Sequence, residues 1–136
     1  MPTSAATLHI GEVADRVGLS LRTVHYYEEQ GLFEPAGRTD GGFRLYTEEQ
    51  VDRLLFIKQM KPLGFSVEEM GELLGARDDL CHSHVKRRKA AEDQLAVFAR
   101  DAAERCEKLR EQLASAEEFA RQLARHAPSD ATETGN

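Results

Sequence analysis

Apolar residues recur at helical spacing soon after the start of the chain and predict a short helix over residues 10–16. Its apolar face is formed by Ile10, Val13 and Val17. Gly18 directly after this pattern is typical of a left-handed helix cap. Residues 1–8 lack any such periodicity and are expected to be disordered.

A second helical pattern follows after a tight turn. Ser20 is typical of an N-cap, Leu21 and Val24 are expected to face inward, and Gly31 ends the predicted helix over residues 21–29. Two short helices joined in this way form a helix-turn-helix, whose second helix enters the major groove of DNA with its N-terminal residues first. The side chains expected nearest DNA are those of Arg22, Thr23, His25 and Tyr26.

The next segment alternates short apolar runs with turn residues and predicts a β-hairpin wing. Its strand-like runs are residues 32–33 and 43–46, separated by Pro35 and the Gly-rich residues 39–42. Arg44 and Tyr46 share one face of the second run. A reading helix next to a basic wing would offer partners for base edges and for phosphates in one unit.

A second pair of helices is predicted after the wing. Thr47 with Gln50, and Ser66 with Glu69, each form the spacing of a capping box. Hydrophobic staples are expected between Tyr46 and Val51 and between Phe65 and Met70, and the core residues of the first helix are expected to be Leu54, Leu55 and Met60. This helix should end before Pro62. Lys58 and Lys61 lie near the turn, where a second phosphate-contacting loop is expected.

From His84 to about Arg125 the chain contains neither Gly nor Pro, and apolar residues alternate at spacings of three and four. A helix of about 42 residues is roughly 63 Å long and cannot bury such a stripe against a small head. We therefore expect a homodimer, with an antiparallel coiled coil favoured. The predicted dimerisation residues are Leu95, Phe98, Ala102, Cys106, Leu109, Leu113, Ala116, Phe119 and Leu123.

Composition and charge narrow the class of protein. The 136 residues are 31% charged and 40% apolar, which is ordinary for a globular protein, and no apolar run approaches the roughly 20 residues of a membrane span. We therefore expect a cytoplasmic location. Cys81 and Cys106 are expected to be reduced, because they would lie about 37 Å apart on one continuous helix and could not pair within a chain. No nucleophile, base and orienting group occur together, so an enzyme is not expected.

The net charge of −6 weighs against DNA binding unless the cations gather on one face. Residues 1–80 hold eight Lys and Arg against fourteen Asp and Glu. A nonspecific nucleic-acid binder would normally be basic.

Several linked motifs resemble the MerR family of bacterial transcription regulators over roughly residues 8–75. They are Ile10-Gly11-Glu12-Val13, Thr23-Val24-His25-Tyr26-Tyr27-Glu28, Gly31-Leu32, Gly42-Phe43-Arg44-Leu45-Tyr46 and Leu63-Gly64-Phe65-Ser66. The resemblance implies a mainly α fold, in which a winged helix-turn-helix head is followed by a long dimerisation helix in an antiparallel coiled coil. It also implies a homodimer on promoter DNA that distorts a long spacer and realigns the contact elements of RNA polymerase.

The resemblance also suggests DNA-contacting residues. It implies helix contacts by Ser20, Arg22, Thr23, Tyr26 and Tyr27, a wing contact by Arg44 and a second-loop contact by Lys61. We add Arg38, and we keep His25, Tyr46 and Lys58 as candidates. His25 stands where the family usually has Arg, and Phe43 replaces a frequent Tyr. The alternatives are that the tyrosines pack inside the head and that the cations are solvated surface residues; the basic run 86–89 fits a solvated helix start best.

A metal site is a weaker hypothesis. The resemblance makes Cys81 similar to a cysteine that often binds metal at the start of the family's coil helix, but no cysteine follows Cys106. If the coil pairs about residue 103, Cys81 and His82, with His84 nearby, come close to His126 of the partner subunit, and such a set could hold Zn. A free thiol beside surface histidines is the simpler alternative, and Cys106 fits a small packing residue.

The predicted organisation is a head over 9–76, a linker over 77–83, a dimerisation helix over 84–126 and a disordered tail over 127–136. The alternative function is an architectural or excisionase-like DNA-binding protein without an effector. Such proteins share the winged head but usually lack a long dimer helix.

Overall fold

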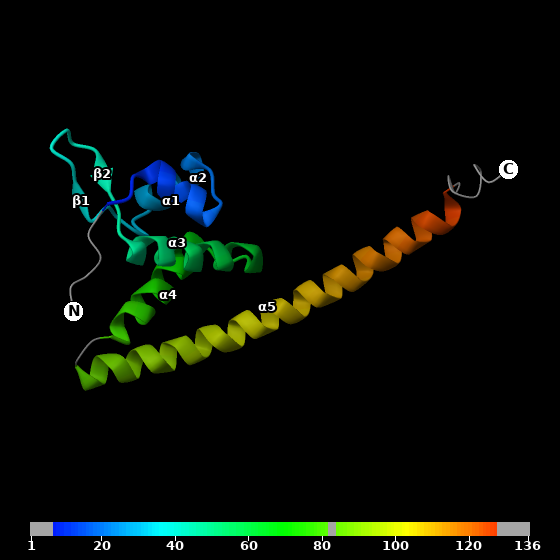
Figure 1. Ribbon diagram of the computed structural model, residues 1–136. Helices are drawn as coiled ribbons and strands as arrows, with labels where there is room; N and C mark the ends of the chain where they lie inside the picture. The colour runs from blue at the N-terminus through cyan, green and yellow to red at the C-terminus, as the bar shows by residue number, and fades with distance from the viewer. Residues whose placement is uncertain (1–6, 82–83, 128–136) are drawn as a thin grey trace. The chain divides into compact units, whose positions relative to one another are not determined.

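The computed structural model describes residues 7–81 and 84–127. Its elements in chain order are α1 (Ile10–Val17), α2 (Leu21–Glu29), β1 (Gly37–Arg38), β2 (Arg44–Leu45), α3 (Glu48–Met60), the 3₁₀ turn η1 (Lys61–Leu63), α4 (Val67–Asp79) and α5 (Val85–His126) (Figure 1). The predicted fold class, mainly α with a small hairpin and a long C-terminal helix, is confirmed. The chain divides after Phe98 into two compact units, which we describe separately.

The helix-turn-helix forms as the sequence predicts. Gly18 caps α1 in the left-handed conformation, with φ of 75°, and its N–H donates to the carbonyl of Ala14. Ser20 caps α2 by accepting a hydrogen bond from the backbone N–H of Thr23 at 3.1 Å. Val24 is buried, but Leu21 is 48% exposed, so the prediction that Leu21 faces inward is wrong. Leu21 lies three positions before Val24, at the first residue of α2, so it stands at the end of the helix rather than within its buried stripe.

The wing is shorter than predicted and starts later. β1 pairs antiparallel with β2, with Gly37 opposite Leu45 and Arg38 opposite Arg44. The prediction that residues 32–33 form its first strand is wrong, because both side chains are buried in the core and the ring of Phe33 packs 5.9 Å from that of Tyr46. The prediction of disorder up to residue 8 also fails at Leu8, which forms a β-bridge with Tyr46.

The second helix pair supplies most of the remaining core. Both predicted capping boxes are present, at the starts of α3 and α4. Along α3 the buried residues are Val51, Leu54, Ile57 and Met60. Leu55 is 38% exposed and was predicted wrongly as a core residue, since Leu54 and Ile57 already define the inward stripe.

The start of α5 packs on the head rather than standing apart from it. Ala91 is buried, and the rings of Phe65 and Phe98 lie 6.1 Å apart in an edge-on arrangement. The predicted linker over 77–83 is also too long, because α4 continues to Asp79, which pairs with Arg87 at 3.4 Å. The prediction that the apolar stripe of α5 cannot reach the head is therefore wrong at Phe98, which contacts Phe65 there.

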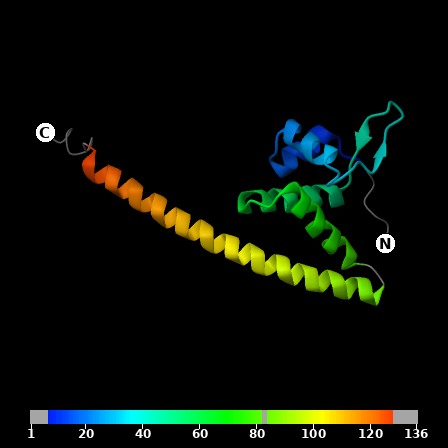
Figure 2. The same cartoon turned by 180° about the vertical axis from the view of Figure 1, so that it is seen from behind.

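The second unit, residues 99–126 of α5, is a single helix (Figures 1 and 2). It carries an exposed apolar stripe. Its exposed large apolar side chains are Leu109, Leu113, Phe119 and Leu123. Pairs of opposite charge such as Arg105 with Asp101 support the helix at spacings of three and four residues. The described helices include none with the length and apolarity that crossing a bilayer requires. The remaining residues of the predicted tail, 128–136, lie outside the described residues.

Candidate nucleic-acid interface

The exposed face of α2 forms one side of a surface hollow, and Lys61 of η1 lines another part of it. The hollow is lined by Arg22, Thr23, His25, Tyr26, Tyr27, Glu29 and Lys61. The first six residues come from α2, while Lys61 follows α3 more than thirty residues later in the chain. Two of the predicted contact segments, the reading helix and the second loop, therefore meet in space.

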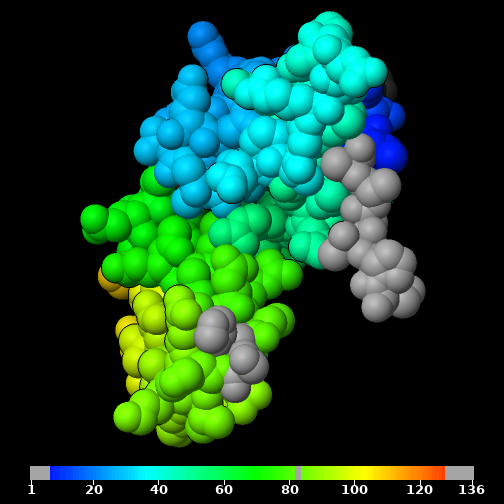
Figure 3. Space-filling view, turned by 90° about the vertical axis from the view of Figure 1, so that its left-hand side faces the viewer, coloured from blue at the N-terminus to red at the C-terminus, as the bar shows by residue number. Residues whose placement is uncertain are grey.

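Two further hollows continue this surface onto the wing. One is lined by residues that include His25, Glu28, Arg38 and Arg44, and the other by residues that include His9, His25, Phe43 and Arg44. His25 lines all three hollows, so it marks the junction between helix and wing. Figure 3 shows α2 in blue and the wing in cyan side by side on one face of the first unit. We call this surface the α2–wing face.

The cations of the α2–wing face differ in how strongly they are held. Arg22 and Lys61 form no ion pair with the residues that the structure describes. Arg38 donates to the carbonyl of Gly42 at 3.0 Å, across the wing turn. Arg44 pairs with Glu28 at 2.8 Å. Because cations gather here, the acidic balance of the head as a whole does not argue against an anionic partner.

The polar side chains of the α2–wing face are accessible to solvent, as contact with a DNA groove requires. Tyr26 is 45% exposed, and its ring is tilted against that of Tyr27 at 5.6 Å. Ser20 is exposed but uses its hydroxyl within the cap, where it also donates to the hydroxyl of Thr23 at 3.0 Å. The predicted residues Ser20, Arg22, Thr23, His25 and Tyr26 thus share one accessible helix surface.

Three predicted contact residues make internal contacts in the head. Tyr46 is fully buried and its hydroxyl donates to Glu28 at 2.7 Å, so it cannot touch DNA in this conformation. Tyr27 is buried, as the packing alternative expected, and only borders the first hollow. Lys58 donates to the carbonyl of Val17 at 2.7 Å and so satisfies the C-terminal end of α1. The pattern of Tyr46 with Arg44 on one strand face misled the prediction, because β2 is only two residues long.

Two residues of the face were missed. Phe43 is 68% exposed at the wing turn, with its ring edge-on to His9 at 6.5 Å. Glu28 lies between α2 and the wing and accepts hydrogen bonds from both Arg44 and Tyr46. Phe43 could have been found as an apolar residue inside a Gly-rich turn, whereas Glu28 required knowledge of which strand lies beside α2.

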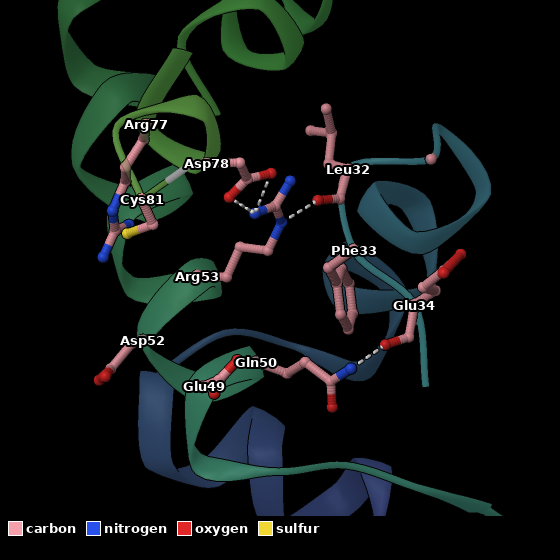
Figure 4. Close-up of a pocket in the computed structure, with 11 residues that line it drawn as sticks. Leu32, Phe33, Glu34, Glu49, Gln50, Asp52, Arg53, Arg77, Asp78 and Cys81 are labelled. Carbon is pink, nitrogen blue, oxygen red and sulfur yellow. Dashed lines mark hydrogen bonds and ion pairs between the residues drawn. The ribbon is translucent and has the colours of Figure 1, made fainter. Parts of the chain in front are cut away.

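A fourth hollow lies elsewhere on the head, between α3, the end of α4 and the segment after α2 (Figure 4). Arg53 crosses it, donating to the carbonyl of Leu32 at 2.7 Å and pairing with Asp78 at 2.9 Å. The side chain of Gln50 donates to the carbonyl of Glu34. These bonds tie residues 32–34 to α3 and α4, so the hollow supports the segment that leads into the wing.

Comparison with known proteins identifies the family. A family model described as MerR HTH family regulatory protein matches residues 8–76, and one described as MerR, DNA binding matches residues 51–126. The chain belongs to the MerR family. An uncharacterized HTH-type transcriptional regulator, PA4778 of Pseudomonas aeruginosa, is 34% identical over 123 residues, which is 90% of this chain and 87% of that protein.

Other relatives of this MerR-family chain match the head most strongly. The mercuric resistance operon regulatory protein of Bacillus cereus is 48% identical over 69 residues, which is 51% of this chain and 52% of that protein. The match thus spans about half the length of that relative. These relatives are named as regulatory proteins, not as enzymes.

Solved structures of the family share the fold. A MerR-family transcriptional regulator from Bacillus cereus is similar with a TM-score of 0.57 and 29% identity, over 86% of this chain and 75% of that one. PbrR691 from Ralstonia metallidurans, solved in complex with lead(II), is similar with a TM-score of 0.51 and 28% identity, over 90% and 89%. The predicted family resemblance is therefore confirmed.

The metal candidates of this MerR-family chain are not assembled within one copy. Across residues 7–81 and 84–127 no three His, Cys, Asp or Glu side chains group closely enough to hold a metal ion. Cys81 is exposed, and Cys106 is a free, partly exposed thiol. His84 and His126 are among the described residues, whereas His82 lies outside them.

Proposed function

We propose that this MerR-family protein is a DNA-binding transcription regulator that reads promoter DNA through its α2–wing face. The observation that carries the proposal is the continuity of that face: the exposed side of α2, the loop at Lys61 and the wing border one another through His25 and Lys61. A duplex presents base edges in the groove and phosphates on both sides of it. A helix flanked by two cationic loops matches that arrangement.

The roles within the face follow from reach and chemistry. Arg22 and Thr23 lie in the first turn of α2 and Tyr26 lies one turn further, on the part of a reading helix whose side chains meet base edges. Lys61, Arg38 and Arg44 lie on the two flanks and suit phosphate contacts. A histidine at position 25 offers a phosphate fewer donors than the Arg usual in the family.

We propose that the protein acts as a homodimer through the second unit. The apolar stripe with Leu109, Leu113, Phe119 and Leu123 is exposed in the single chain. Burial of each large side chain would contribute about 1.5 to 3 kcal/mol, doubled by symmetry, against an association cost of about 4 to 15 kcal/mol. Leu113→Lys should give monomers by sedimentation, whereas Ala114→Lys, which adds the same charge on the helix face opposite the stripe, should stay dimeric. A monomeric wild-type protein at micromolar concentration would contradict the proposal.

On a promoter, we propose that such a dimer distorts the spacer DNA and so changes how RNA polymerase engages the site. Two heads at a fixed separation contact two half-sites. The energy needed to bend the DNA between them depends on base pairs that the protein does not touch. Footprinting between the two core promoter elements separates this function from that of an architectural protein, whose protection would not be confined to that spacer.

We propose a metal ion as the effector. Two relatives support this proposal, since one is named for mercuric resistance and another was solved with lead(II). The candidate set is Cys81 and His84 with His126 of the partner subunit, and its chemistry suits Zn. Metal analysis of dimer purified without chelators should find stoichiometric metal that Cys81→Ser removes. A metal-free dimer that also fails to take up added Zn would refute this part of the proposal.

DNA binding itself is tested by fluorescence anisotropy with fragments of the region upstream of the protein's own gene, over a series of salt concentrations. Arg22→Ala should lower affinity and relax sequence preference, while Lys61→Ala should weaken binding to all fragments and reduce the salt slope by about 1. Lys108→Ala, which removes an exposed cation from the second unit, is the matched control and should change neither. Indifference of the wild-type protein to every fragment at moderate salt would refute the proposed function.

A further inference from the structure

Glu28 occupies an unexpected position for a carboxylate on a surface that meets a polyanion. It lies on α2, and its side chain is only 11% exposed. One of its oxygens, Oε1, accepts a hydrogen bond from Nη1 of Arg44 at 2.8 Å, and the other, Oε2, accepts one from the hydroxyl of Tyr46 at 2.7 Å. Nδ1 of His25 lies 3.9 Å from Oε1. Both carboxylate oxygens of Glu28 therefore accept hydrogen bonds, and each bond links α2 to a residue in or next to β2.

This arrangement leaves part of Arg44 available. A guanidinium carries five N–H donors in a planar fork, and the structure assigns one of its nitrogens to Glu28. The Arg44 side chain is 44% exposed and lines two hollows of the α2–wing face. A charge-assisted bond on one side of the fork fixes its plane, so the remaining donors meet a phosphate without the cost of ordering a free side chain.

We propose that Glu28 is a positioning residue for DNA binding, which acts by holding Arg44 in the orientation that contacts a phosphate. The inference rests on the proposed function, because it assigns a role within the same face. Its physical content is that a negative charge on this face increases affinity. Coulomb repulsion alone predicts the opposite.

The neighbouring residue Glu29 provides a matched control. It also lies on α2 and lines two of the same hollows, but it is exposed and forms no hydrogen bond or ion pair with the described residues. Neutralising Glu29 removes the same charge from the same face without disturbing a positioned cation. The two variants Glu28→Gln and Glu29→Gln therefore separate positioning from simple repulsion.

The experiment compares wild type, Glu28→Gln, Glu29→Gln, Arg44→Ala and the double variant Glu28→Gln/Arg44→Ala by anisotropy with one promoter fragment at several salt concentrations. Glu28→Gln should bind about tenfold more weakly and lose about 0.9 from the salt slope, as expected for one lost phosphate contact. Glu29→Gln should bind as well as wild type or better. In the Arg44→Ala background Glu28→Gln should have little further effect, because its effect passes through Arg44.

The outcomes distinguish the two proposals. If wild type binds no fragment, the proposed function fails. If wild type binds and Glu28→Gln binds equally or more tightly, or if its loss simply adds to that of Arg44→Ala, the positioning role alone is refuted. Thermal unfolding checks that Glu28→Gln is folded. Should it unfold, Arg44→Lys tests the same contact, because lysine keeps the charge but lacks the fork; unchanged affinity of Arg44→Lys would overturn the inference.

Discussion

The buried hydroxyl of Tyr46 gives a quantitative prediction about alkaline stability. Burial, reinforced by the hydrogen bond to the Glu28 carboxylate, raises the pKa of Tyr46 from about 10 to about 12. A group whose pKa is higher in the folded state contributes stability that is fully present below its unfolded pKa and is lost as pH rises through the folded pKa. The window for this loss is therefore pH 10 to 12.

The magnitude follows from the size of the shift. At a pH of about 11 the unfolded phenol is mostly ionised and the folded one is not, so the free energy of unfolding falls by roughly 1.4 kcal/mol relative to neutral pH. The full loss above the folded pKa is roughly 2 to 3 kcal/mol. Tyr46→Phe removes this term. It should be less stable than wild type near neutral pH, where the charge-assisted hydrogen bond is worth about 1.5 to 3 kcal/mol, and the gap should narrow at high pH.

Denaturant unfolding of both proteins at pH about 8 and about 11 measures the change, because other alkaline titrations largely cancel between them. The phenolate absorbance offers an independent check, since the chain has three tyrosines and no tryptophan. The difference between the wild-type and Tyr46→Phe titrations should show a midpoint well above 10. A midpoint at the ordinary tyrosine value, or a stability gap that does not change with pH, would refute the reasoning.

Three further predictions test other parts of the molecule. Phe43→Ala should weaken promoter binding without changing the salt slope, because an apolar contact releases no counterions, and an altered slope in the anisotropy series would contradict this. Ser66→Ala should cost about 1 kcal/mol in denaturant unfolding by removing the cap of α4, whereas Ser115→Ala, inside an exposed helix, should cost nothing; equal costs would show that the cap is not the cause. The Arg16 hydrogen bond lowers the pKa of Glu48, so their ion pair should stabilise the head above pH 4.5 and lose that effect as pH falls further; an Arg16→Met variant with unchanged acid dependence would argue otherwise.

Local signals predicted the elements well. The caps at Gly18, Ser20 and Ser66 depend on a few adjacent residues, and the structure has all three. The long helix could be predicted because nothing between residues 84 and 125 interrupts it. These features are encoded within one or two turns of chain, so they need no knowledge of the fold.

The errors arise where distant segments meet. Residues 32–33 have strand-like composition, but the packing of Phe33 against Tyr46 in the core overrides this preference. Phe98 has the spacing of a coiled-coil residue, and the sequence did not reveal that its ring also contacts Phe65 in the head. At the candidate interface the sequence offered the cations as candidates, but it could not reveal that Lys58 donates to the carbonyl of Val17 in α1 or that Arg44 pairs with Glu28.

The segregation of charge on the head bears on how the protein would search for its site. Residues 1–80 carry more acids than bases, while Arg22, Arg38, Arg44 and Lys61 lie on the α2–wing face, so orientations that turn the rest of residues 1–80 toward a duplex bring more like charges to it. Such a molecule should spend little time on random sequence, since misaligned encounters are repelled before contact. Its selectivity for its own site would then come partly from the short lifetime of misaligned complexes. Added salt should reduce this selectivity by screening the repulsion.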